Sequence, residues 1–170
     1  MKKICKSCRT EFYVTIESMS RPISGDVCPS CLTRLATATD AAAFRPIIDM
    51  IDAPTLVMQP DSRLVLTANA RAAAVFGKSA TEMEGHSGGA AFGCVHAVPP
   101  ARCGEDSTCA TCRIKTAVAE TLASGKPYSA ITMTLPIACD DDEVPHTVTV
   151  STERTGPFAL LRIDRLQAEP

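Results

Sequence analysis

The sequence predicts an α+β domain in which a five-stranded antiparallel sheet carries its helices on one face. A small cysteine-rich module precedes this domain. Over residues 44–167, β-prone runs and helical stripes follow one another in the order two strands, helices, three strands, which is typical of this class. The nine cysteines fall mainly into two groups. With 170 residues, 45% of them apolar, the chain is long enough for one ordinary domain and one small module.

Charge and composition exclude several classes of protein. Seventeen basic and 19 acidic residues give a net charge of −2, which argues against a surface that binds nucleic acid or acidic lipid throughout. The basic start of the chain is not followed by the apolar stretch of a secretion signal, and uncharged stretches such as 85–101 contain Gly and Pro, unlike a membrane span. We therefore expect a cytoplasmic protein without membrane contact. In a reducing cytosol, paired cysteines indicate metal ligands or redox groups before disulfides.

The first module, residues 1–36, is defined by its cysteines. Cys5-x2-Cys8 is followed after nineteen residues by Cys28-x2-Cys31, the spacing of a zinc site made of four thiolates. About 35 residues cannot bury a sufficient core alone, and structural zinc supplies the missing stability. The β-prone run 11–16 predicts one arm of a hairpin. The module resembles bacterial zinc ribbons, and we expect its zinc to be structural.

The basic residues near the first cysteine pair allow more than one interpretation. They are Lys2, Lys3, Lys6 and Arg9. They leave a nucleic-acid contact open, beside a solvated face or a surface that docks another protein.

Residues 37–43 are expected to link the module to the second domain, with Asp40 as a helix N-cap. Phe44, Ile47, Ile48 and Ile51 then predict one apolar helical face. Runs 56–58 and 64–66 predict a hairpin around the turn residues 60–62. A short helix over 69–76 should end at Gly77.

The rest of the second domain follows the same pattern. Residues 85–104 are rich in Gly and Pro and should be irregular. A second apolar stripe from Ile114 to Leu122 predicts a long helix ended by Gly125. Runs at 128–137, 146–152 and 158–163 predict the last three strands.

One segment carries a family resemblance. After the first hairpin, the run Asn69-Ala70-Arg71-Ala72-Ala73-Ala74-Val75-Phe76-Gly77 looks like the start of a PAS sensor domain, in which a helix that begins Asn-x-Ala and ends in Phe-Gly follows the second strand. The resemblance covers about residues 44–166 and also rests on the order of the elements. It implies sensing or partner docking, and a homodimer formed through the leading helix.

The second cysteine group lies where the resemblance places the wall of a ligand cavity. Its four members fall within 19 residues at the spacing C-x8-C-x5-C-x2-C, and they are Cys94, Cys103, Cys109 and Cys112. Neighbouring glycines let backbone approach a bulky iron–sulfur core, and a thiolate at a helix start is stabilised there. Both features would also serve a second zinc ion, and reversible disulfides or free thiols remain a third alternative.

Two residues near these cysteines are ambiguous. His96 could replace one cysteine as a ligand or donate a hydrogen bond to a sulfur. Cys139 precedes the acidic run 140–143, which lacks the spacing of a calcium loop, and we interpret Cys139 as a bystander. The arrangement of the four cysteines resembles a cysteine-rich PAS variant of bacterial signalling proteins, which implies that they bind a cluster or metal.

These observations favour a cytoplasmic signalling protein that senses redox state or a diatomic gas through an iron–sulfur cluster. Since no kinase, cyclase or DNA-binding helix-turn-helix segment fits in the remaining residues, the signal should pass by contact with a protein such as a histidine kinase. One alternative is an adaptor or nucleic-acid-binding protein with two structural zinc sites. Another is a thiol-redox enzyme using Cys109 and Cys112, which leaves Cys94 and Cys103 without a role. Hydrolase and nucleotide-binding motifs are absent, so we expect no enzyme.

Overall fold

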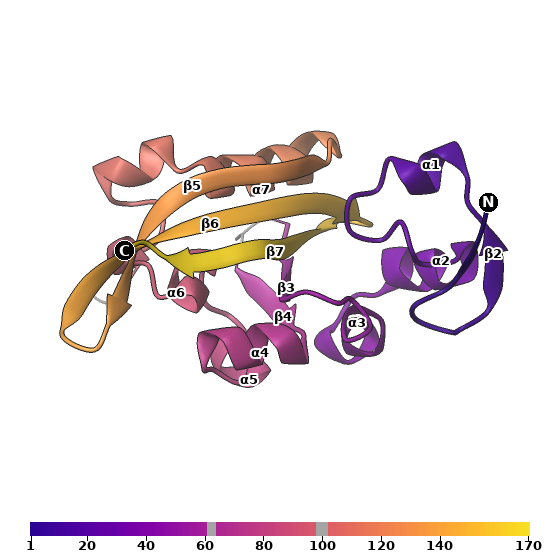
Figure 1. The fold of residues 1–170 in the computed structure, drawn as a ribbon, viewed down its shortest axis with the longest axis horizontal. Coiled ribbons are helices and arrows are strands. Elements are labelled where there is room, and N and C mark those ends of the chain that lie inside the picture. The colour runs from indigo at the N-terminus through magenta and orange to yellow at the C-terminus, as the bar shows by residue number, and fades with distance from the viewer. Residues whose placement is uncertain (61–63, 98–101) are drawn as a thin grey trace.

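The computed structural model describes residues 1–60, 64–97 and 102–170. Its chain runs from a small N-terminal module at one end of the long axis to a twisted sheet flanked by helices (Figure 1). Part of the predicted turn at 60–62 lies outside the described residues.

The N-terminal module contains a hairpin and two helices. Strands β1 (Lys2–Ile4) and β2 (Glu11–Tyr13) pair antiparallel, with Lys3 opposite Phe12. The predicted hairpin arm is confirmed in β2, but the strand ends before residue 16. It ends because the side chains of Thr15 and Ser18 form a capping box for helix α1 (Ile16–Met19). Helix α2 (Pro29–Thr37) starts directly after Cys28.

The predicted five-stranded antiparallel sheet and the α+β class are confirmed. Its strands are β3 (Thr55–Met58), β4 (Val65–Ala68), β5 (Tyr128–Cys139), β6 (Asp142–Thr155) and β7 (Phe158–Ala168). They lie in the order β4-β3-β7-β6-β5. The last three strands are longer than predicted, because β5 and β6 stay paired as far as Cys139 and Asp142, and only residues 140–141 turn.

Local capping signals place most helices. Asp40 caps α3 (Ala41–Ile48) by accepting from the Ala43 amide at 2.8 Å. Asn69 caps α4 (Ala70–Phe76), and Gly77 ends it with φ of +62°. Helix α7 (Arg113–Ser124) starts after Cys112 and ends at Gly125, as expected.

The segment 85–104 is more regular than predicted. Helix α5 (Ala80–Met83) precedes it, and it contains helix α6 (Gly88–Phe92) and a 3-10 turn, η1 (Val95–Ala97). A second 3-10 turn, η2 (Ser107–Thr111), follows it. The Ser87 side chain caps α6 by accepting from Ala90 N, and Gly93 ends it in the left-handed region. The prediction of irregular structure is wrong for residues 88–92, because these caps outweigh the low helix propensity of glycine. Residues 98–101 of the predicted segment lie outside the described residues.

Helices cover both faces of the sheet, which corrects the prediction that they gather on one. Leu56, Met58 and Leu161 face α4–α7 and share a core with them. Val57 and Leu160 point to the opposite face, as alternation along a strand requires. That second core is completed by residues from the N-terminal module, from α3 and from the segments directly before and after α3, which are Ile23, Leu35, Ala38, Phe44, Ile47, Ile48 and Ile51. The module therefore packs against the sheet.

Candidate functional site

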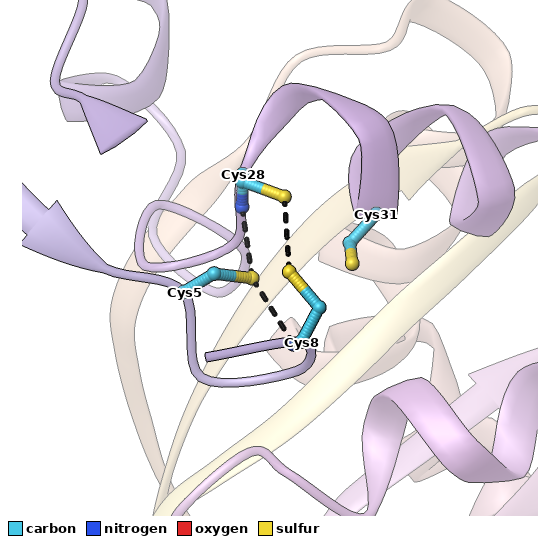
Figure 2. A group of neighbouring side chains, drawn as sticks. All are labelled: Cys5, Cys8, Cys28 and Cys31. Atoms are coloured by element: carbon cyan, nitrogen blue, oxygen red, sulfur yellow. Dashed lines mark hydrogen bonds between the residues drawn. The ribbon is translucent and has the colours of Figure 1, made fainter. Parts of the chain in front are cut away.

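The four N-terminal cysteines converge on one point. Cys5 and Cys8 come from the β1–β2 turn, and Cys28 and Cys31 from the start of α2; Figure 2 shows the two pairs facing each other. All four sulfurs lie within 4.8 Å of one another, and Cys8 Sγ is 3.6 Å from Cys28 Sγ. A tetrahedral zinc ion with Zn–S bonds of about 2.3 Å places its sulfurs about 3.8 Å apart. These four residues can therefore bind a metal ion such as zinc.

Backbone geometry aims amide groups at one of these sulfurs. The turn after Cys5 is closed by Arg9 N donating to Cys5 O at 2.9 Å, with Arg9 at φ of +65°. This turn directs Cys8 N toward Cys5 Sγ at 3.5 Å, while Cys28 N donates to the same sulfur at 3.2 Å. Amide donors to sulfur favour the thiolate, which is the metal-binding form.

The surroundings give the four thiols different acidities. The Thr10 hydroxyl, 3.2 Å from Cys8 Sγ, lowers the pKa of Cys8 to about 6. Burial raises the pKa of Cys28 to about 12. For Cys5, burial also acts to raise the pKa, but amide donors led by that of Cys28 outweigh it and lower the pKa overall. A bound cation would offset the cost of burying thiolates here.

Acidic side chains face the lysines of the module. Asp26 lies 2.5 Å from Lys3 Nζ and 3.3 Å from Lys6 Nζ, and these contacts, led by that with Lys3, hold the pKa of Asp26 below its usual value. Lys2 Nζ is 3.4 Å from Glu11. The positive charge of all three lysines is thus partly compensated within the chain.

The second cysteine group lines a single cavity of about 290 Å³ on the α4–α7 face of the sheet. All four predicted residues, Cys94, Cys103, Cys109 and Cys112, contribute to its wall. This volume is close to the lower end of the range for ligand pockets, which is about 300 Å³. The structure therefore brings the predicted cysteines together around a space large enough for a small ligand.

Three of these cysteines are held in, or directly beside, a helix or 3-10 turn. Cys94 follows α6, and its segment is attached to β5 by Ala138 N donating to Gly93 O at 2.9 Å. Cys109 lies in η2. Cys112 caps α7, with Lys115 N donating to its sulfur at 3.5 Å.

The spacing of these sulfurs differs from that of the first group. Over residues 1–60, 64–97 and 102–170, only the N-terminal group brings three or more potential metal-ligating side chains within 4.8 Å of one another. The cavity cysteines thus line a shared cavity but are less closely grouped than the four N-terminal cysteines. Burial raises the pKa of the Cys94 thiol, and desolvation within the cavity wall raises the pKa of Cys103 although that residue is partly open to solvent. Both shifts favour the neutral thiol.

Several further residues line this cavity that the cysteine spacing did not predict. Met58 and Met133 contribute thioethers, and Met133 Sδ is 3.8 Å from Cys112 Sγ. Lys115 contributes a cation. Met133 alternates with Ile131 and Leu135 along its strand, so the period of two already indicated that it points inward. Lys115 lies one helical turn after Cys112, a spacing that brings side chains close together.

The two ambiguous residues have clear positions. His96 also lines the cavity, and its Nδ1 is 3.3 Å from a carboxylate oxygen of Asp106. Asp106 accepts from the Thr108 amide at 2.8 Å and so caps η2. Cys139 is exposed at the end of β5 and does not line the cavity.

The comparisons with known proteins add no family. No protein-family model matches the chain, and no curated protein matches its sequence. None of the helices in the described part of the chain is both long enough and apolar enough to cross a membrane.

Proposed function

We propose that the protein senses redox state or a diatomic gas through an iron–sulfur cluster held by Cys94, Cys103, Cys109 and Cys112, and relays the state by contact with another protein. The observation that carries the proposal is that four cysteines spread over residues 94–112 line one cavity of about 290 Å³. When bound, such a cluster supplies a reversible one-electron change.

The chemistry of the cavity wall fits this group. The thiolates of an iron–sulfur cluster are separated by several irons and sulfides, so their sulfurs stand further apart than the sulfurs around one zinc ion. The sulfurs of the cavity cysteines are likewise less closely grouped than those of the N-terminal cysteines. Lys115 and His96 offer positive charge or hydrogen bonds beside a negatively charged thiolate-bound cluster. Gly89 leaves room for Cys103, because a Cβ at position 89 would lie 3.0 Å from the Cys103 sulfur.

The resemblance to PAS sensor domains supports the same function. Asn69 caps α4, Phe76-Gly77 ends it, and the segment between α4 and α7 walls the cavity. Helix α7 connects this wall to the sheet, because the Cys112 sulfur accepts from its first turn while Ile114 and Val118 pack in the core. A change at Cys112 therefore acts directly on the start of α7.

A protein partner, for example a histidine kinase, fits the surface of the N-terminal module. Large apolar side chains are unusually exposed there, and they are Met1, Ile4, Tyr13, Ile16 and Met19. Exposed apolar groups concentrated in one region favour protein contact. The pairing of Lys3 and Lys6 with Asp26 weakens the case for nucleic acid. A second copy of the chain is another partner that binding assays should include.

Anaerobic purification followed by metal analysis and absorption spectroscopy tests the proposal. We expect one zinc ion per chain together with iron, sulfide and a broad visible absorption that bleaches on reduction. Cys109→Ser should lose iron and colour but keep one zinc ion, whereas Cys139→Ser, which alters an exposed cysteine outside the cavity, should keep both.

Two other results would contradict the proposal. Two zinc ions per chain without visible absorption would favour the adaptor with two structural zinc sites. A Cys109→Ser variant with the full metal content of the unmodified protein would favour thiol chemistry at Cys109 and Cys112.

A further inference from the structure

A buried carboxylate joins the N-terminal module to the sheet. The Glu153 side chain on β6 is only 4% exposed. It accepts from the amides of Ile23 at 2.9 Å and Ser24 at 3.0 Å, and the Ser24 hydroxyl also donates to it. Arg21 Nη1 lies 3.5 Å away. The donors that satisfy Glu153 therefore come from one short segment of the module, residues 21–24.

The same segment leads directly into the metal-binding cysteines. Two residues after Ser24, Asp26 accepts from Lys6 N at 3.0 Å through its carbonyl, and its carboxylate pairs with Lys3 and Lys6. Cys28 N then donates to Cys5 Sγ at 3.2 Å. Residues 21–28 are consequently held at one end by Glu153 and at the other by the cysteine group.

A second sheet residue strengthens the attachment. Arg162 on β7 donates through Nη1 to the Pro22 carbonyl at 2.5 Å. Figure 1 shows the connection between α1 and α2 lying against the ends of β6 and β7. The module is thus anchored to two neighbouring strands.

The residue next to Glu153 faces the cavity side of the sheet. Thr152 Oγ1 lies 2.7 Å from Thr121 Oγ1 on α7, and both residues are fully buried. Helix α7 begins at Cys112, which lines the cavity. Adjacent positions of β6 therefore contact the metal-binding module on one side and the cavity helix on the other.

We propose that metal binding by Cys5, Cys8, Cys28 and Cys31 is coupled, through residues 21–28 and Glu153, to the order of α7. Without metal, the four thiols no longer hold residue 28 in place. Residues 21–24, which donate the hydrogen bonds to Glu153, are then no longer anchored at the cysteine end of the segment 21–28. A buried carboxylate without donors is strongly unfavourable, so water enters and this end of β6 loosens. Thr152 then no longer holds Thr121 in place.

Coupling of this kind is reciprocal. Weakening the hydrogen bonds between Glu153 and residues 23–24 must therefore lower the metal affinity of the four N-terminal cysteines, although no metal ligand is altered. The N-terminal group is then a regulatory site, and its metal content sets how firmly the cavity wall is held. That this wall reports a redox signal rests on the proposed function, whereas the coupling itself does not.

The first test measures Zn²⁺ affinity of the full chain by competition with a chromophoric chelator. Glu153→Ala should bind Zn²⁺ roughly tenfold more weakly than the unmodified protein, within the usual range of about 5–150-fold for coupled sites. The control is Glu143→Ala, which removes an exposed carboxylate near the other end of β6, and its affinity should be unchanged. If Glu153→Ala does not fold, Ser24→Ala removes a single donor and should weaken binding by a smaller factor.

The second test removes Zn²⁺ from the unmodified protein with a chelator and follows hydrogen exchange. Amides of α7 should exchange about tenfold faster after removal. Equal exchange of α7 with and without Zn²⁺, or unchanged Zn²⁺ affinity in the substituted protein, would overturn the coupling. Neither measurement needs iron in the cavity, so a failure of the sensing proposal and a failure of the coupling give different results.

Discussion

Two adjacent glycines of α6 offer a matched test of the cavity wall. A Cβ at Gly89 would lie 3.0 Å from both the Cys103 sulfur and the Ala97 Cβ, whereas a Cβ at Gly88 would meet only the end of the Met58 side chain at 3.4 Å. Gly89→Ala should therefore displace Cys103, and Gly88→Ala should leave the cysteines in place.

The expected magnitudes follow from two opposing effects. Replacing glycine by alanine in a helix contributes up to about 1 kcal/mol to stability, and the two substitutions share this gain. Overpacking at position 89 costs about 1–3 kcal/mol, because the Ala97 Cβ belongs to a short rigid side chain. Gly88→Ala should be neutral or stabilising, and Gly89→Ala should be less stable than it by about 1–3 kcal/mol.

Urea denaturation followed by circular dichroism measures this difference, and metal analysis of the same samples measures the effect on the cavity. On the proposal that the cavity cysteines hold an iron–sulfur cluster, Gly89→Ala should carry less iron than Gly88→Ala, since Cys103 relieves the overlap only by moving its sulfur. Equal stability and equal iron content in the two variants would refute the reasoning that position 89 has no room for a methyl group.

Three further substitutions test the module and the interior. Cys31→Ser removes one ligand of the N-terminal group and should weaken Zn²⁺ binding at least tenfold in chelator competition; unchanged affinity would exclude this residue as a ligand. Asn69→Ala should lower the free energy of unfolding by about 2–4 kcal/mol in urea denaturation. The buried Asn69 side chain accepts from the amides of Thr55 and Ala72 and donates to the carbonyls of Ile48 and Ala53. A loss below about 1 kcal/mol would contradict this account. Thr121→Val should cost about 1–2 kcal/mol by leaving the Thr152 hydroxyl and the Lys126 carbonyl without their partner, and a stability equal to that of the unmodified protein would show that water replaces both contacts.

Element boundaries were predictable where a single residue caps a helix. Asp40, Gly77 and Gly125 all act at the helix ends where the sequence placed them, because capping depends on bonds to residues only a few positions away. The prediction failed at residues 88–92, where Gly88 and Gly89 suggested a loop. The caps at Ser87 and Gly93 are local signals that outweigh the two glycines, whereas the close approach of Ala97 and Cys103 to position 89 has no local signal.

The arrangement of layers was harder to predict. The sequence showed that Val57 and Leu160 lie in apolar strands, but both faces of these strands are apolar, so alternation did not tell which helices cover each face. Helix α3 and the N-terminal module together supply the second core. The strand pattern alone therefore could not place them.

The sequence by itself determined which cysteines act together. Two residues between thiols form a tight turn, so the pairs at residues 5 and 8 and at 28 and 31 were recognisable from their spacing. Only the tertiary structure decided that the sulfurs of the N-terminal cysteines lie within 4.8 Å of one another, whereas the cysteines at 94–112 line a cavity. Only it joined Glu153 to Ile23, 130 positions apart. Contacts of that kind depend on how whole layers pack, which local sequence does not encode.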